Sequence, residues 1–148
     1  MSFRFPLQPV LRLRKSLEHL ERQRLEIVTQ QLAKLREESE SLKKEQEAAA
    51  ERLAKAMEEG LTSVELQYEL ACSQARERRQ IALAKGIAAL VQQRQSQIVA
   101  FRHARQKRQI LDNLRNRQLE IYEQTEARRE QQQLDDLFLI RLQTEQRR

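Results

Sequence analysis

The stretch Glu58–Glu65, "EEGLTSVE", constrains the fold of this chain more than any other, because it interrupts an otherwise continuous helical pattern. Gly60 can adopt the left-handed backbone conformation that commonly ends a helix. Thr62 can cap a new helix, and Glu65, three residues later, can complete a capping box. A stop signal and a start signal this close together predict a short turn between two antiparallel helices.

The chain on both sides of this turn consists mainly of helix-forming residues. Its 148 residues include two Gly, two Pro and no Trp, and 34% of them are charged. Such a composition is typical of long helices and coiled coils, with disorder as the alternative. We therefore expect an all-α single domain over residues 1–148, namely an antiparallel coiled-coil hairpin with an overhanging C-terminal tail. The first helix is expected over about 9–59, the turn over about 60–62 and the second helix over about 63–142.

Apolar residues at three- and four-residue spacing indicate the buried face of each helix. In the first helix they form two series, offset by one residue near Ile27 and Val28, and such an offset locally changes supercoil winding. The first series is Val10, Leu13, Leu17 and Leu20, and the second is Val28, Leu32, Leu35, Leu42, Ala49, Leu53 and Ala56. In the second helix the predicted buried stripe is Ile81, Ala84, Ala88, Val91, Ile98, Phe101, Leu111, Leu114 and Ile121.

The C-terminal stretch "LDDLFLIRL" concentrates apolar residues where the first helix can no longer pair with the second. A reversal at Leu61 places the start of the first helix opposite about residue 115, so the later residues overhang. An isolated helical tail is marginal in water, and contact with a partner could order it. The alternative is that the first few residues fold back onto the tail. The residues concerned are Leu134, Leu137, Phe138, Ile140 and Leu142 in the tail, and Phe3, Phe5 and Leu7 at the start.

Basic residues dominate the middle of the second helix. The segment Arg76–Arg117 contains eleven Lys or Arg and two acidic residues, a net charge of +9 (11 − 2) in a chain of net charge +6. Such a face attracts phosphate backbones, acidic lipids or an acidic protein surface. Nucleic acid is disfavoured, because Phe101 is the only aromatic residue interleaved with the charges, and a solvated basic face with no dedicated ligand is a further alternative. The predicted exposed partner face comprises Arg76, Arg78, Arg79, Arg102 and Arg105.

The sequence offers no set of residues that would support catalysis or bind a metal. His19 and His103 lie in different helices, and neither Cys nor a cluster of acidic residues completes a ligand set around them. Cys72 is the only cysteine, which excludes an internal disulfide. We expect no catalytic residue, cofactor, metal or small-molecule substrate. The chain has no apolar run long enough for a membrane span and no secretory signal, so we expect it in the cytoplasm.

The amino terminus, "FRFPLQPVLRLRKSLEHLERQRLE", resembles the opening of the FliJ family of flagellar type III export proteins. The matching residues are Phe3, Phe5, Leu7, Gln8, Val10, Leu11 and Arg14. The carboxyl-terminal "RREQQQLDDLFLIR" is similar to the basic and acidic ending of that family, with Arg128, Arg129, Glu130, Asp135, Asp136 and Arg141 in comparable places. Asp136 stands where many relatives have Glu.

The resemblance implies a non-enzymatic stalk of the flagellar type III export apparatus. Its implied partners are the hexameric export ATPase, the cytoplasmic domain of the membrane export gate, and export chaperones. It also implies a cytoplasmic protein that is peripherally associated with the inner membrane at the flagellar base. We expect the contacts with the ATPase ring to come from Val10, Leu11, Leu134, Leu137 and Phe138. The alternatives are a general coiled-coil adaptor or chaperone, and a basic rod that binds nucleic acid.

Overall fold

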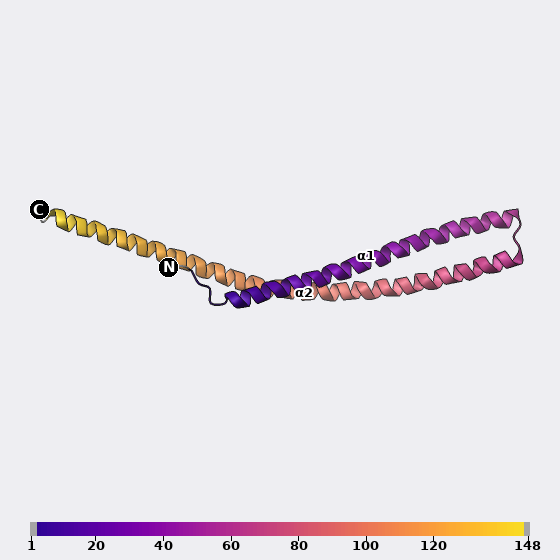
Figure 1. Cartoon of the computed structure of the whole chain (residues 1–148), viewed down its shortest axis with the longest axis horizontal. Coiled ribbons are helices and arrows are strands. Elements are labelled where there is room, and N and C mark those ends of the chain that lie inside the picture. The colour runs from indigo at the N-terminus through magenta and orange to yellow at the C-terminus, as the bar shows by residue number, and fades with distance from the viewer. Residues whose placement is uncertain (1–2, 147–148) are drawn as a thin grey trace. The chain divides into compact units, whose positions relative to one another are not determined.

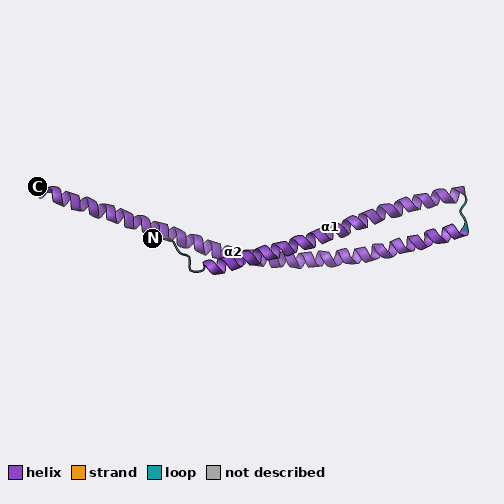
Figure 2. Cartoon of the chain, in the orientation of Figure 1, coloured by secondary structure: helices purple, strands orange, loops and turns teal. Residues whose placement is uncertain are grey.

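The computed structural model describes residues 3–146, which form two long α-helices in contact. Helix α1 spans Gln8–Glu59 (52 residues), and helix α2 spans Ser63–Gln146 (84 residues). Figure 2 shows that helix is the only regular secondary structure drawn for the described residues. The predicted all-α hairpin is therefore confirmed.

The chain divides into two compact units, and each contains an antiparallel pair of segments from α1 and α2. The turn unit is His19–Arg102, which comprises most of α1, the turn and the first half of α2. In Figure 1 its two helical segments are joined by the turn at one end of the drawing. The terminal unit comprises the described residues up to 18 and from 103 onward, where the indigo start of α1 lies beside the orange segment of α2.

The turn has the local chemistry that its sequence predicts. Gly60 has a φ of 101°, a conformation that residues with a side chain rarely adopt. The backbone N–H of Thr62 donates to the Glu65 carboxylate at 2.9 Å, and the backbone N–H of Glu65 donates to the Thr62 hydroxyl at 3.3 Å. This reciprocal pair of hydrogen bonds is a capping box, which starts α2 immediately after Gly60 has ended α1.

The buried face of α1 follows an uninterrupted three-and-four spacing from its first turn. Its members are Leu11, Arg14, Glu18, Glu21, Leu25, Val28, Leu32, Leu35, Ser39, Leu42, Gln46, Ala49, Leu53 and Ala56, all buried or partly buried. The predicted second series belongs to this face. The first series was wrong, since Val10, Leu13, Leu17 and Leu20 are exposed, and no offset occurs near Ile27.

The predicted offset fails because charged residues occupy core positions near the start of α1. Glu18 accepts a hydrogen bond from Arg108, and Glu21 accepts one from Gln97. These long side chains can pair across the hairpin while their aliphatic parts pack in it. The spacing therefore continues through polar residues, and the more conspicuous apolar series beside it faces outward.

The buried face of α2 is also displaced by one residue from much of the predicted stripe. Its members are Arg76, Gln80, Leu83, Ile87, Leu90, Gln97, Phe101, Ala104, Arg108, Leu111, Arg115, Gln118 and Tyr122. Ile98, Phe101 and Leu111 are partly buried as predicted, but Ile81, Ala84, Ala88, Val91, Leu114 and Ile121 are exposed. A displacement of one residue rotates a side chain about 100° around the helix axis.

The residues before α1 pack within the terminal unit. The Phe3 ring lies 5.7 Å from the Tyr122 ring, centre to centre, and Phe5 is buried. Phe3, Phe5 and Arg115 line one shallow hollow. The alternative in which these aromatic residues cover the apolar stretch near Phe138 is therefore wrong. Phe3 packs against Tyr122 instead, and the apolar side chains of the tail are exposed.

Neither helix contains a stretch that is both apolar enough and long enough to cross a membrane, among the residues described.

Candidate partner-binding surfaces

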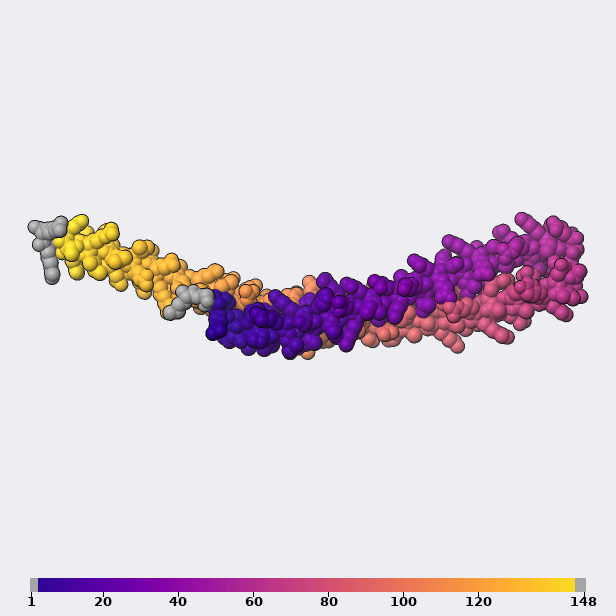
Figure 3. Space-filling model, in the orientation of Figure 1, coloured from indigo at the N-terminus to yellow at the C-terminus, as the bar shows by residue number. Residues whose placement is uncertain are grey.

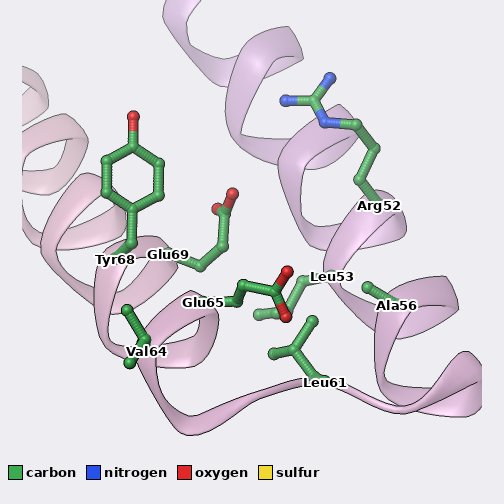
Figure 4. A pocket seen from close by; sticks show the side chains of 8 residues that line it. All are labelled: Arg52, Leu53, Ala56, Leu61, Val64, Glu65, Tyr68 and Glu69. Carbon is green, nitrogen blue, oxygen red and sulfur yellow. The ribbon is translucent and has the colours of Figure 1, made fainter.

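The first candidate surface surrounds the turn. Figure 4 shows Leu61 pointing from the turn into the space between the helices, where Leu53 and Ala56 of α1 also lie. These side chains line an open hollow of about 500 Å³, together with Arg52, Val64, Glu65, Tyr68 and Glu69. Val64 and Tyr68 are highly exposed. The hollow can receive an apolar side chain of a partner, with charged groups of both signs at its edge.

The capping box also affects the ionisation of one residue at this surface. The hydrogen bond from the Thr62 backbone N–H, with a further one from the Thr62 hydroxyl, lowers the pKa of Glu65 below its ordinary value of 4.5. These bonds favour the charged form of the carboxyl group. Glu65 therefore stays ionised near the positive end of α2, where a negative charge is stabilising.

The second candidate surface is the predicted basic face. Its arginines in the turn unit differ in exposure and in ion pairing. Arg78 and Arg102 are exposed, and Arg79 forms an ion pair with Glu38 of α1. Arg76 is largely buried, with 17% of its side chain exposed and an ion pair of 3.9 Å to Glu69. The expectation that Arg76 is exposed was therefore wrong, because residue 76 is one of the core positions of α2.

In the terminal unit, Arg105 is exposed and Arg108 is enclosed by acidic residues. The Arg108 guanidinium donates to Glu18 of α1 and to Asp112 of α2, and Lys15 lies 3.9 Å from Asp112. The hydrogen bond to Glu18, followed by that to Asp112, raises the pKa of Arg108. Arg108 therefore links the two helices and is not free to contact a partner, whereas Arg105 is.

The third candidate surface is the C-terminal tail of α2. Every residue from 127 to 145 is exposed, including six large apolar side chains. They are Leu134, Leu137, Phe138, Leu139, Ile140 and Leu142. The yellow segment of α2 in Figure 3 has no other described segment against it on the face shown. Exposed apolar side chains in such number are typical of an interaction surface.

The described residues contain no group of three or more His, Cys, Asp or Glu that could hold a metal ion. His19 and His103 are both exposed, and Cys72 is a free, partly buried thiol. The three candidate surfaces offer apolar contacts and charge, which are interactions that can bind a partner.

A family comparison decides among the kinds of binding protein. The model of the family described as flagellar FliJ protein matches residues 3–147. The chain belongs to the FliJ family. No curated protein and no solved structure matches it. This FliJ chain is consequently a component of flagellar protein export, and the resemblance noted in its terminal sequences is confirmed over essentially the whole chain.

The amino-terminal residues by which this FliJ chain resembles its family have different surroundings in the structure. Leu11 is fully buried and Phe5 nearly so, whereas Val10 is 39% exposed. Leu11 and Phe5 therefore stabilise the terminal unit, and Val10 is available to a partner. The sequence prediction also missed that Leu13 and Leu17 are surface residues. Extension of the three-and-four spacing from Val28 back to Leu11, through polar as well as apolar residues, could have revealed this.

Proposed function

We propose that this chain is a non-enzymatic coupling stalk, which binds the hexameric export ATPase through its tail and the cytoplasmic domain of the export gate through other surfaces. Membership of the FliJ family supports a role in flagellar export. The exposed apolar side chains of the tail are the proposed contact with the ATPase ring, since removing them from water lowers the free energy of the complex. Leu134, Leu137 and Phe138 are the proposed contact residues, with Val10 adding to them and Leu11 supporting Val10 from the core.

The proposed basic contacts are Arg78, Arg79, Arg102 and Arg105, which can attract an acidic surface of the gate or of an export chaperone. Arg76 supports this face from within the hairpin through Glu69. In this proposal the protein works in the cytoplasm, is peripherally associated with the inner membrane at the flagellar base, and uses no cofactor. The whole chain is proposed to act as one domain.

The proposal predicts that the purified chain raises both hexamer content and ATP turnover of the export ATPase. Leu137→Asp with Phe138→Asp should abolish these effects, because burial of a carboxylate in place of either apolar side chain is costly. Analytical ultracentrifugation and a phosphate-release assay measure the two effects. Circular dichroism should show unchanged helicity, since both residues are exposed.

The matched control is Ile81→Asp with Val91→Asp, which places two charges on exposed apolar residues of the turn unit outside the three candidate surfaces. This control should still stimulate the ATPase. If the unaltered chain has no effect on assembly and turnover, or if both double variants lose the effect equally, the tail is not the ATPase contact.

A further inference from the structure

The terminal unit buries Leu11 and Phe5, but several of its core positions hold charged residues while apolar residues lie on its surface, unlike an ordinary hairpin. Its core positions include Arg14, Glu18, Arg108 and Arg115. The residue immediately before a core position is instead apolar at six places, and each of these side chains is between 37% and 64% exposed. The six are Val10, Leu13 and Leu17 of α1, and Ile110, Leu114 and Ile121 of α2. We name them the outer flank.

The six residues lie on one side of the terminal unit. Lys15 and Asp112, which form an ion pair, each come immediately after a core position, so the positions after the core share one side of the two helices. The positions before the core must then share the opposite side. The turn unit follows the same rule, since Glu38 and Arg79 pair and each comes immediately before a core position. The outer flank is therefore a continuous strip formed by two adjacent helices.

The spacing of the outer flank is that of a groove for a helix. Val10, Leu13 and Leu17 are three and four residues apart, and Ile110, Leu114 and Ile121 are four and seven residues apart. Seven residues make about two helical turns, so each set forms one row along its helix. An amphipathic helix with the same spacing can place its apolar side chains between the two rows.

Charge indicates what kind of helix fits. The segments 3–18 and 103–122, which contain the outer flank, hold nine Lys or Arg and three acidic residues, Glu18, Asp112 and Glu120. Glu18 and Asp112 are already engaged by Arg108. Lys107 and Arg117 also come immediately before core positions, so they lie on the same side of the terminal unit as the outer flank. A second copy of this chain would bring the same basic excess to the contact and be repelled, whereas an acidic helix is attracted.

We propose that the outer flank binds an acidic amphipathic α-helix of a partner protein, which packs as a third helix against the terminal unit. This interaction goes beyond the proposed coupling function, because it requires neither the tail nor the arginines of the basic face, and Val10 is the one flank residue that is also a proposed ATPase contact. It accounts for the mixed polarity of the unit: the exposed apolar residues contact the third helix, while Leu11 and paired charges such as Glu18 and Arg108 hold the first two together.

The test uses the full chain and two fluorescently labelled synthetic peptides, each of four heptads with Leu at the core positions. One peptide has Glu at the flanking positions, and the other has Lys. Fluorescence anisotropy should show that the Glu peptide binds at least about tenfold more tightly than the Lys peptide, a difference of about 1.4 kcal/mol. Leu13→Asp with Ile110→Asp should weaken binding of the Glu peptide at least about tenfold.

The matched control is Ile81→Asp with Val91→Asp, two exposed apolar residues of the turn unit, and it should bind the Glu peptide as the unaltered chain does. Circular dichroism verifies that both variants are folded. The proposal is overturned if the Glu peptide does not bind, or if both double variants bind it equally. It is also overturned if the outer flank instead mediates self-association in sedimentation equilibrium, or binding to phosphatidylserine vesicles, without binding the peptide. Retained ATPase stimulation by the Leu13 and Ile110 variant would separate this surface from the tail.

Discussion

At the residue scale, the turn was predictable because each of its residues has one dominant local role. Gly60 is needed for a positive φ, and Thr62 and Glu65 satisfy each other's backbone N–H groups. These interactions involve neighbours within three residues, so no knowledge of the opposite helix is required. By contrast, the partial burial of Arg76 and the full burial of Leu11 depend on residues far away in the sequence, and local chemistry did not indicate them.

Glu65→Gln should destabilise the hairpin at neutral pH, and the difference from the unaltered chain should disappear in acid. The pKa of Glu65 is lower in the folded chain than in the unfolded one, so its charged form contributes stability at pH values above its ordinary pKa. That contribution is lost as the pH falls through the lowered value. Urea denaturation at neutral pH and at about pH 2 measures the effect.

Glu51→Gln is the control for this measurement, because Glu51 is an exposed acidic residue in the interior of α1. The free energy of unfolding of Glu51→Gln should differ little from that of the unaltered chain at either pH. Equal destabilisation by Glu65→Gln at both pH values would mean that the carboxylate charge does not stabilise the capping box.

At the scale of the elements, the existence of two helices was easier to predict than the faces by which they pack. Each helix carries apolar residues at two adjacent sets of positions, and only one set can face the partner helix. In α1 the apolar pattern favoured Val10, Leu13 and Leu17, whereas the structure buries Leu11 and pairs Glu18 with Arg108. A count of apolar residues cannot recognise a core position that is held by an ion pair between distant residues, and this is why the prediction was displaced by one residue.

The observed core of α2 is tested by two neighbouring residues. Leu83 is 3% exposed and Ile81 is 52% exposed. Leu83→Ala should lower the free energy of unfolding by about 2–3 kcal/mol, because it leaves a cavity, whereas Ile81→Ala should change it by less than about 0.5 kcal/mol. Urea denaturation monitored by circular dichroism measures both. The reverse order of effects would restore the stripe containing Ile81 as the buried face.

At the scale of the whole molecule, both helices run without interruption through the turn unit and the terminal unit. α1 continues across the boundary between Glu18 and His19, and α2 continues across that between Arg102 and His103. Helix formation is cooperative, so melting of one unit removes the hydrogen-bonded turns from which the helices of the other continue. We therefore expect the chain to unfold as one domain, although each unit has its own set of internal contacts.

This expectation can be measured with the two tyrosines, because Tyr68 lies in the turn unit and Tyr122 in the terminal unit. Tyr122→Phe leaves Tyr68 as the only fluorescent reporter of its type, since the chain has no Trp, and Tyr68→Phe leaves Tyr122. In each variant the thermal midpoint from tyrosine fluorescence should coincide with that from far-UV circular dichroism, as two-state unfolding requires. If instead each tyrosine reports a transition that circular dichroism resolves as a separate step, the units are independent domains, and only the continuous helices connect them.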